Sequence, residues 1–290
     1  MKKNKFAYRV VCPAFLYLFV FLGLPIIMGL VISFFDYNPL SSSNQFVGIA
    51  NFQKMFSDEN FQIAFKNTFV FTFATVFLNI LLALILATFI STFQSNKVRS
   101  FFRMVFFLPC IAPSVATSIV FGRSIYPTKT GLLNIVRKAL GLSSINWLGD
   151  PSKIMLSLIL YSIWVDVGYN IILFSAGIDG IPKEMLEAAE LDGAGSWKKF
   201  TKIIFPLLGR TFQFVVVQTL ISHFQMFSQF AILVTKDPTR SGLVLSKYIY
   251  DQAFNYHNMG YASAISMILF LVILVISKID QKATRVDWEY

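Results

Sequence analysis

The feature that most constrains this chain is a series of long segments without a single charged residue. Residues 10–35 and 67–96, for example, contain no Asp, Glu, Lys or Arg. A helix needs about 20 apolar residues to cross the hydrocarbon core of a bilayer. Charged residues make up only 14% of the chain, against about 25% in a typical soluble domain. The sequence therefore predicts an all-α integral membrane protein.

The apolar segments predict six transmembrane helices in a single transmembrane domain that covers residues 1–290. Their expected bounds are 10–35, 67–94, 104–122, 154–177, 211–235 and 260–277. Lys2, Lys3, Lys5 and Arg9 precede the first segment, so a cleaved signal peptide is the alternative there. The apolar run is too long for one, and no small-x-small cleavage site follows it, so we expect an uncleaved anchor.

The distribution of basic residues predicts the orientation. Six spans place both termini on one side, together with the loop after span two and residues 178–210. These regions carry more of the 25 Lys and Arg residues than the other loops do. Cytoplasmic loops are enriched in Lys and Arg, so we expect a protein of the cell (plasma or inner) membrane with both termini in the cytoplasm. Basic loops beside a membrane explain the net charge of +10 without a nucleic-acid partner. Cys12 and Cys110 both fall in apolar segments, so we expect no disulfide framework.

The segment between spans four and five, residues 178–210, predicts a helical hairpin. Pro182 suits the first turn of a helix that runs to Leu191. Gly193 can adopt the left-handed conformation that ends a helix. Ser196 is expected to cap a second helix, and Pro206 is expected to stop it.

This hairpin resembles the EAA loop in the permease subunits of binding-protein-dependent ABC importers. The matching residues are Glu187, Ala188, Ala189, Asp192, Gly193, Ala194 and Pro206. An ordinary amphipathic cytoplasmic loop is the alternative. The resemblance implies a type I ABC importer permease fold whose cytoplasmic coupling-helix hairpin docks onto an ATPase.

Other motifs resemble the carbohydrate-uptake branch of these permeases, the maltose and glycerol-phosphate type. They include Phe46-Val47-Gly48, Pro109 with Pro113, the run 146–151, and Trp164 with Gly168. The resemblance implies a homologous second permease in a heterodimer, two ABC ATPase subunits, an extracytoplasmic solute-binding protein and a sugar substrate. It also implies that ATP and Mg are bound by the ATPase subunits, and that this chain itself binds no cofactor.

Polar residues inside spans four and five form the candidate substrate site. Polar groups in hydrocarbon are costly and normally face the bundle interior or a wet cavity. Helical spacing places them in two stripes, Ser162, Asp166 and Tyr169 with the adjacent Asn170, and Gln218, Ser222, Gln225 and Gln229. Hydrogen bonding between helices is the alternative. The resemblance implies that the span-four residues contact the sugar, although an acidic Asp166 is unusual there and pairing with another span is its alternative role.

Catalysis by this chain is not expected. His223 and His257 lie in different segments and lack metal-ligand spacing, and no phosphate-binding Gly-x-x-x-x-Gly-Lys-Ser/Thr motif occurs. An intramembrane enzyme would need a convergent acid, base or metal set. The other alternative is an ion-coupled secondary transporter of a small polar solute. That class would suit Asp166, but it usually shows internal repeats and broken helices, which the sequence does not indicate.

Overall fold

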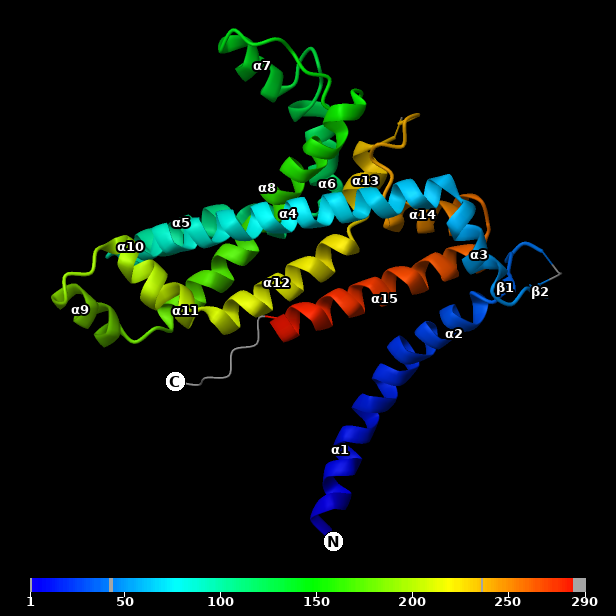
Figure 1. Cartoon of the computed structure of the whole chain (residues 1–290), viewed down its shortest axis with the longest axis horizontal. Helices are drawn as coiled ribbons and strands as arrows, with labels where there is room; N and C mark the ends of the chain where they lie inside the picture. The colour runs from blue at the N-terminus through cyan, green and yellow to red at the C-terminus, as the bar shows by residue number, and fades with distance from the viewer. Residues whose placement is uncertain (1, 42–43, 236, 284–290) are drawn as a thin grey trace. The chain divides into compact units, whose positions relative to one another are not determined.

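The computed structural model describes residues 2–41, 44–235 and 237–283, and the side chains of residues 9–41, 44–235 and 237–282. The described chain is mostly helical, and it divides into two compact units (Figure 1). Unit 1 comprises residues 1–64 and 245–272, and unit 2 comprises residues 65–244 and 273–290. Two long helices, α4 and α15, each contribute to both units, so the single-domain expectation stays a prediction.

Unit 1 begins with a long apolar helix and closes with part of α15. Arg9–Ile32 forms a 24-residue candidate span whose tested window has no buried residue, as expected for a helix whose apolar side chains face lipid. The side chains of Lys2, Lys3 and Lys5 lie outside those described. The elements are α1 (Lys2–Leu18), η1 (Phe19–Gly23), α2 (Leu24–Ile32), β1 (Phe35–Asp36), β2 (Gln45–Phe46), α3 (Ala50–Ser57), α14 (Leu245–Tyr250), η4 (Asp251–Asn255) and α15 (Met259–Ala283).

Asp58 ties the polar loop of unit 1 to its C-terminal helices. Its Oδ2 accepts hydrogen bonds from the hydroxyls of Tyr248 and Tyr261, at 2.5 and 2.6 Å. Burial alone would raise the pKa of the Asp58 carboxyl, but these hydrogen bonds and those from backbone N–H groups outweigh it and lower the pKa. Earlier in the chain, before α3, a two-stranded antiparallel ribbon pairs Phe35 with Phe46.

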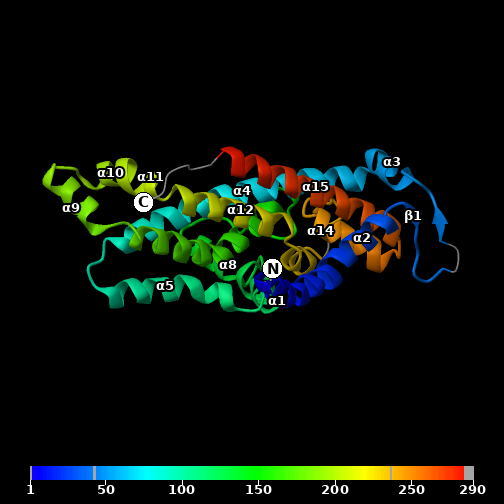
Figure 2. The ribbon, with the colours of Figure 1, turned by 90° about the horizontal axis from the view of Figure 1, so that it is seen from below.

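Unit 2 holds most of the membrane helices. Figure 2 shows α8 between α5 and α12, both of which it contacts. The α5–α8 packing is close, because a Cβ atom at Gly168 would lie 2.0 Å from the carbonyl oxygen of Phe106. The elements are α4 (Glu59–Ser91), α5 (Asn96–Ile111), α6 (Ser114–Val120), η2 (Phe121–Ile125), α7 (Leu132–Ala139), α8 (Pro151–Asp179), α9 (Lys183–Leu191), α10 (Ser196–Lys199), η3 (Phe200–Ile204), α11 (Phe205–Leu207), α12 (Gly209–Phe224) and α13 (Ser228–Leu233).

One of the expected spans is bent, and a second bend separates the hairpin from span five. The sequence predicts an unbroken helix over 104–122, whereas α5 begins at Asn96, ends at Ile111 and meets the helix Ser114–Ile125 at 92°. Pro113 explains the break, since it disfavours helical backbone at Ala112, whose ψ is 138°. The helices Ser196–Leu207 and Gly209–Leu233 likewise meet at 69°.

The described residues contain four helices that could span a membrane alone, and six spans if each bent pair counts as one. This agrees with the expected number, while the helix bounds differ by a few residues. The fourth and sixth spans begin and end further out than predicted, as Pro151–Asp179 and Met259–Lys282. The second, Glu59–Ser91, begins and ends earlier than predicted. Asp150 explains the early start of α8, because its side chain accepts a hydrogen bond from the backbone N–H of Ser152 and Pro151 occupies the first turn.

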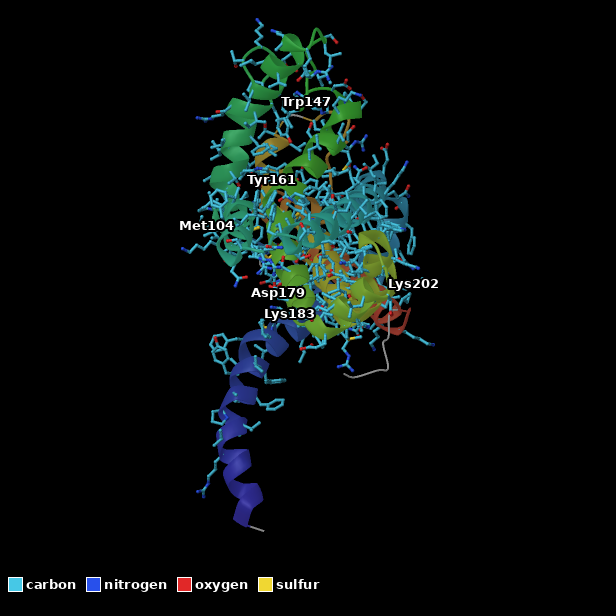
Figure 3. The ribbon with its side chains drawn as sticks, turned by 90° about the vertical axis from the view of Figure 1, so that its left-hand side faces the viewer. Met104, Trp147, Tyr161, Asp179, Lys183 and Lys202 are labelled. Carbon is cyan, nitrogen blue, oxygen red and sulfur yellow. The ribbon has the colours of Figure 1, made fainter. Side chains whose placement is uncertain are left out.

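The apolar core of unit 2 surrounds the first half of α8. Tyr126, Trp147 and Tyr161 are among its buried side chains, and Figure 3 shows Trp147 and Tyr161 along this half of the unit. A buried tyrosine needs a partner for its hydroxyl. Tyr161 lies 2.7 Å from the hydroxyl of Thr117 and 2.9 Å from that of Ser118, which anchors α6 to α8.

Candidate functional site

The predicted hairpin forms, and its turn is a glycine-terminated helix end. Gly193 has φ +75°, a left-handed conformation that favours glycine. The N–H of Ala194 donates to the carbonyl of Ala189, and the N–H of Gly193 donates to that of Glu190. These two bonds define a Schellman motif, which satisfies carbonyls that the end of α9 would otherwise leave without partners.

Two local expectations for the hairpin are wrong. Ser196 does not cap the second helix, because Gly195 occupies the cap position and Ser196 is the first helical residue. Pro206 does not stop the helix, which runs on to Leu207. The π-helical turn over Phe200–Ile204 changes the hydrogen-bond register just ahead of Pro206, which then sits in the first turn of α11, where a missing N–H is tolerated.

The hairpin presents its surface outward. Helix α9 has no buried residue, and Leu191 and Trp197 are 91% and 77% exposed. None of the residues of the EAA resemblance is buried: Glu187, Ala188, Asp192, Gly193 and Pro206 are exposed, and Ala189 and Ala194 are half-buried. Large exposed apolar side chains beside small ones are typical of a surface that binds a partner protein.

A group of charged side chains lies at the root of the hairpin, where α8 ends at Asp179. The Asp179 carboxylate accepts from Arg103 at 2.8 Å and lies 3.4 Å from Arg99. Arg99 also donates to the carbonyl of Ser91, the last residue of α4, and to that of Phe93 just past it. The ends of α4, α5 and α8 are thereby joined beside Lys183, where the hairpin starts (Figure 3).

Asn170, predicted to bind substrate, instead lies in a buried polar network. It is 2% exposed, and its Nδ2 donates to Asn79 Oδ1 at 2.8 Å and to Thr219 Oγ1 at 3.0 Å. These bonds join α8 to α4 and α12. These hydrogen bonds favour the interhelical role that was the alternative for the polar stripes, and substrate contact by Asn170 stays a prediction.

The sequence analysis missed a third stripe, on α4. Its members are buried and four, three and four residues apart: Thr68, Thr72, Thr75 and Asn79. The same spacing argument that selected the stripes of spans four and five would have found it.

The stripe predicted on span five is interrupted. Helix α12 ends at Phe224, and α13 begins only at Ser228, so Gln229 does not continue the face formed by Gln218 and Ser222. Gln229 is buried, and its Nε2 lies 3.4 Å from the hydroxyl of Ser162, which is itself buried and donates to the carbonyl of Leu158. The burial of Ser162 and Gln229 favours a packing role over solute contact.

Asp166 pairs with a residue that the sequence analysis did not select. Its Oδ2 lies 3.7 Å from Nε2 of His223 on α12, and both atoms are buried without a hydrogen-bond partner in the described part of the chain. The His223 ring is fixed by its Nδ1, which lies 2.9 Å from the carbonyl of Thr219. The sequence hints at this pair only in that span four contains an aspartate and span five contains a histidine.

Four of the remaining predicted residues keep exposed surface on unit 2. Tyr169 is 43% exposed, Ser222 and Gln225 are exposed, and the Asp166 side chain is 30% exposed. Gln218 is half-buried. The Ser222 hydroxyl donates only to the carbonyl of Gln218 in its own helix. We call Asp166, Tyr169, Ser222 and Gln225 the open polar face.

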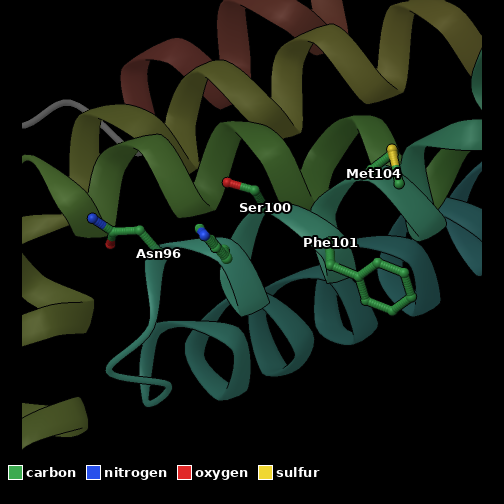
Figure 4. A pocket seen from close by; sticks show the side chains of 5 residues that line it. Asn96, Ser100, Phe101 and Met104 are labelled. Atoms are coloured by element: carbon green, nitrogen blue, oxygen red, sulfur yellow. The ribbon is translucent and has the colours of Figure 1, made fainter.

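One pocket of unit 2 lies on α5 alone. Figure 4 shows a pocket of about 450 Å³, lined by Asn96, Lys97, Ser100, Phe101 and Met104. All five residues belong to α5, so this pocket is a groove along one helix. Within the described part of the chain, no three His, Cys, Asp or Glu side chains are placed to hold a metal ion.

Comparison with known proteins places these features in a family. A family model described as "Binding-protein-dependent transport system inner membrane component" matches residues 79–281. The probable ABC transporter permease protein YurN of Bacillus subtilis (strain 168) is 35% identical over 277 residues, which cover 95% of this chain and 94% of that protein. The arabinooligosaccharides transport system permease protein AraP of the same organism is 37% identical over 57% of this chain and 53% of its own length.

A solved structure shares the fold. A chain in the crystal structure of a bacterial alginate ABC transporter, in complex with an alginate pentasaccharide-bound periplasmic protein, superposes with a TM-score of 0.85. It is 24% identical, and the match covers 98% of this chain and 95% of that one. The ABC importer permease fold and the multi-pass membrane location predicted from the sequence are thus confirmed.

Proposed function

This chain belongs to the family of inner membrane components of binding-protein-dependent transport systems, and we propose that it forms one half of the transmembrane path of an ATP-driven sugar importer. The other half is a homologous permease. Two ABC ATPase subunits supply ATP hydrolysis, with ATP and Mg bound on those subunits, and an extracytoplasmic binding protein delivers the solute. The observation that carries the proposal is an outward-facing hairpin in the same chain as an open polar face.

The hairpin is the proposed contact with the ATPase. Its alanines and Gly193 allow close approach of a partner, and the exposed Leu191 and Trp197 give that partner apolar surface to cover. When the ATPases close on ATP, the hairpin moves with them. The arginine–aspartate group at its root transmits this motion, because it joins the end of α8 to the ends of α4 and α5.

The open polar face is the proposed solute contact. Amide, hydroxyl and phenol groups suit a neutral polyhydroxyl solute, since they can exchange hydrogen bonds with its hydroxyls while the Tyr169 ring stacks on a sugar face. AraP, named for arabinooligosaccharide transport, supports an oligosaccharide as the solute. The partner permease would cover this face from the other side.

Uptake measurements test the function. The chain would be co-expressed with a partner permease, ATPases and binding protein, reconstituted in vesicles, and assayed with a panel of labelled oligosaccharides. We expect uptake that requires ATP and the loaded binding protein. Uptake driven by a proton or sodium gradient without ATP would instead indicate a secondary transporter.

Labelling tests the proposed orientation. In a variant lacking Cys12 and Cys110, a single cysteine at Lys199 should react only from the cytoplasmic side, and one at Ser143 only from the outside. Reaction of both from the same side would contradict the topology.

A further inference from the structure

The contact between Asp166 and His223 plays no part in the sugar-importer proposal above. The Oδ2 atom of Asp166 and the Nε2 atom of His223 face each other at 3.7 Å, and both are buried. In the described part of the chain, neither atom has a hydrogen-bond partner. The protonation of the pair therefore decides whether the two atoms attract or repel.

The second nitrogen of His223 fixes where a proton can be. Its Nδ1 lies 2.9 Å from the carbonyl oxygen of Thr219, and a carbonyl oxygen can only accept a hydrogen bond. Nδ1 must therefore carry a hydrogen. A neutral His223 ring then has a bare lone pair at Nε2, directed at Asp166.

Counting protons leaves one favourable state. With none between them, a carboxylate faces a lone pair, and both buried acceptors remain unsatisfied. With two, a carboxylic acid faces an imidazolium, which leaves an uncompensated positive charge among apolar helices. With one, the proton lies between Oδ2 and Nε2, the two atoms attract each other across 3.7 Å, and the pair is neutral as a whole.

We propose that Asp166 and His223 share a single proton, so that the open polar face binds its solute without net charge and selects uncharged over charged solutes. The proposal rests on the transport function above and specifies the chemistry of the same face. It explains how an acidic residue can sit beside a neutral sugar. The exposed part of the Asp166 side chain remains free to exchange hydrogen bonds with a solute hydroxyl.

Few other groups near the pair can titrate. On α5, Cys110 donates its thiol to the carbonyl of Val165, next to Asp166. Helix α8 itself carries Tyr161 and Tyr169. On α4, Glu59 and Lys66 lie in its first turns, and the rest of the helix, 67–91, contains no titratable side chain; His223 is the one titratable residue of segment 211–235.

The test compares Asp166→Asn with Asp166→Leu in the full reconstituted complex. The Asn amide can donate to Nε2 in place of the shared proton, whereas Leu cannot. We expect Asp166→Leu to lose about tenfold more uptake than Asp166→Asn, since an unmade buried hydrogen bond is costly. Equal losses in the two variants would overturn the proposal.

A pH series supplies a readout that does not depend on transport. Raising the pH removes the shared proton, so the melting temperature of the purified complex should fall on the alkaline side, and Asp166→Asn should lack this fall. Cys110→Ala and His257→Asn are the controls, and both should retain it. Asn is a suitable replacement at His257 because that residue has φ 58°.

The two readouts separate the possible failures. If the complex moves no sugar but the alkaline fall is present and depends on Asp166, the sugar function is wrong and the shared proton stands. If sugar uptake is normal but the unmodified protein and Asp166→Asn show the same pH series, the shared proton is wrong.

Discussion

The sequence predicts a functional role both for the hairpin and for Asn170 of the amide network, which Asn170 forms with Asn79 and Thr219. The two regions differ in how exposed their side chains are. On the hairpin, α9 has no buried residue and Trp197 is 77% exposed. In the network, Asn170 is 2% exposed, and its amide is occupied by Asn79 and Thr219. The hairpin presents exposed side chains that a partner protein could contact. In the amide network, the polar groups are hydrogen-bonded to one another and hold the helices together.

This difference provides a rule for interpreting polar residues in a transport protein of this kind. Substitution of an exposed group should change transport and leave folding intact. Substitution of a group satisfied within the chain should change folding first. The predictions below test the rule on both sides, from the largest expected effect to the smallest.

Gly193→Trp should abolish ATP-driven uptake while the protein still inserts in the membrane. A bulky side chain would hold the ATPase away and would also be strained at φ +75°. Gly141 is a matched control, because it has φ +73° and also ends a helix, α7, with open space around it. Gly141→Trp carries the same backbone strain, so normal uptake there and none with Gly193→Trp would assign the loss to docking. Equal losses would contradict this assignment.

Gln225→Ala should reduce uptake several-fold to about tenfold, since a hydrogen bond lost to a bound solute costs about 1–3 kcal/mol. ATPase activity stimulated by the loaded binding protein should remain, because the hairpin is unchanged. Tyr169→Ala should act in the same direction. If both variants transport normally, the open polar face is not the solute path.

Asn170→Ala should destabilise the protein by about 1–3 kcal/mol, because Asn79 loses its buried donor. Thermal unfolding of the detergent-solubilised protein measures this. Ser222→Ala on the exposed side of α12 is the control, and it should leave the unfolding temperature nearly unchanged. A stable Asn170→Ala protein with altered sugar selectivity would return Asn170 to the substrate site.

Lys199→Ala should have the smallest effect, at most about 1 kcal/mol, because exposed ion pairs contribute little. Lys199 pairs with Glu190, whose side chain is 61% exposed. Uptake close to that of the unmodified protein would show that the Schellman turn, and not this ion pair, maintains the hairpin. A large loss of uptake would instead make Lys199 part of the docking surface.

Much of the fold could be predicted because it follows from local rules. Charge-free segments specify the spans, and the glycine at position 193 specifies the turn of the hairpin. The bend at Pro113 is also a local effect, but proline is tolerated in many spans, so the sequence did not indicate which proline would break its helix.

The candidate site was less predictable, since burial depends on which helices meet. Helical spacing places Ser162, Asp166 and Tyr169 on one face, yet Ser162 is buried and Tyr169 is open. The partner of Asp166 lies on another helix, and no periodicity within α8 could identify His223. The α4 stripe could have been found, because its spacing matches that of the other two.

The glycine contact between α5 and α8 has a mechanical consequence. Because the backbone of Gly168 lies against that of Phe106, we expect α5 and α8 to move together as one rigid body, with little sliding of one helix along the other. A displacement of the hairpin end of α8 would then move both helices as far as Ala112, where α5 ends and the chain turns by 92° into the next helix. We expect the helix break at Ala112 to act as a hinge of the permease, so that the backbone changes there while the helices on either side stay straight.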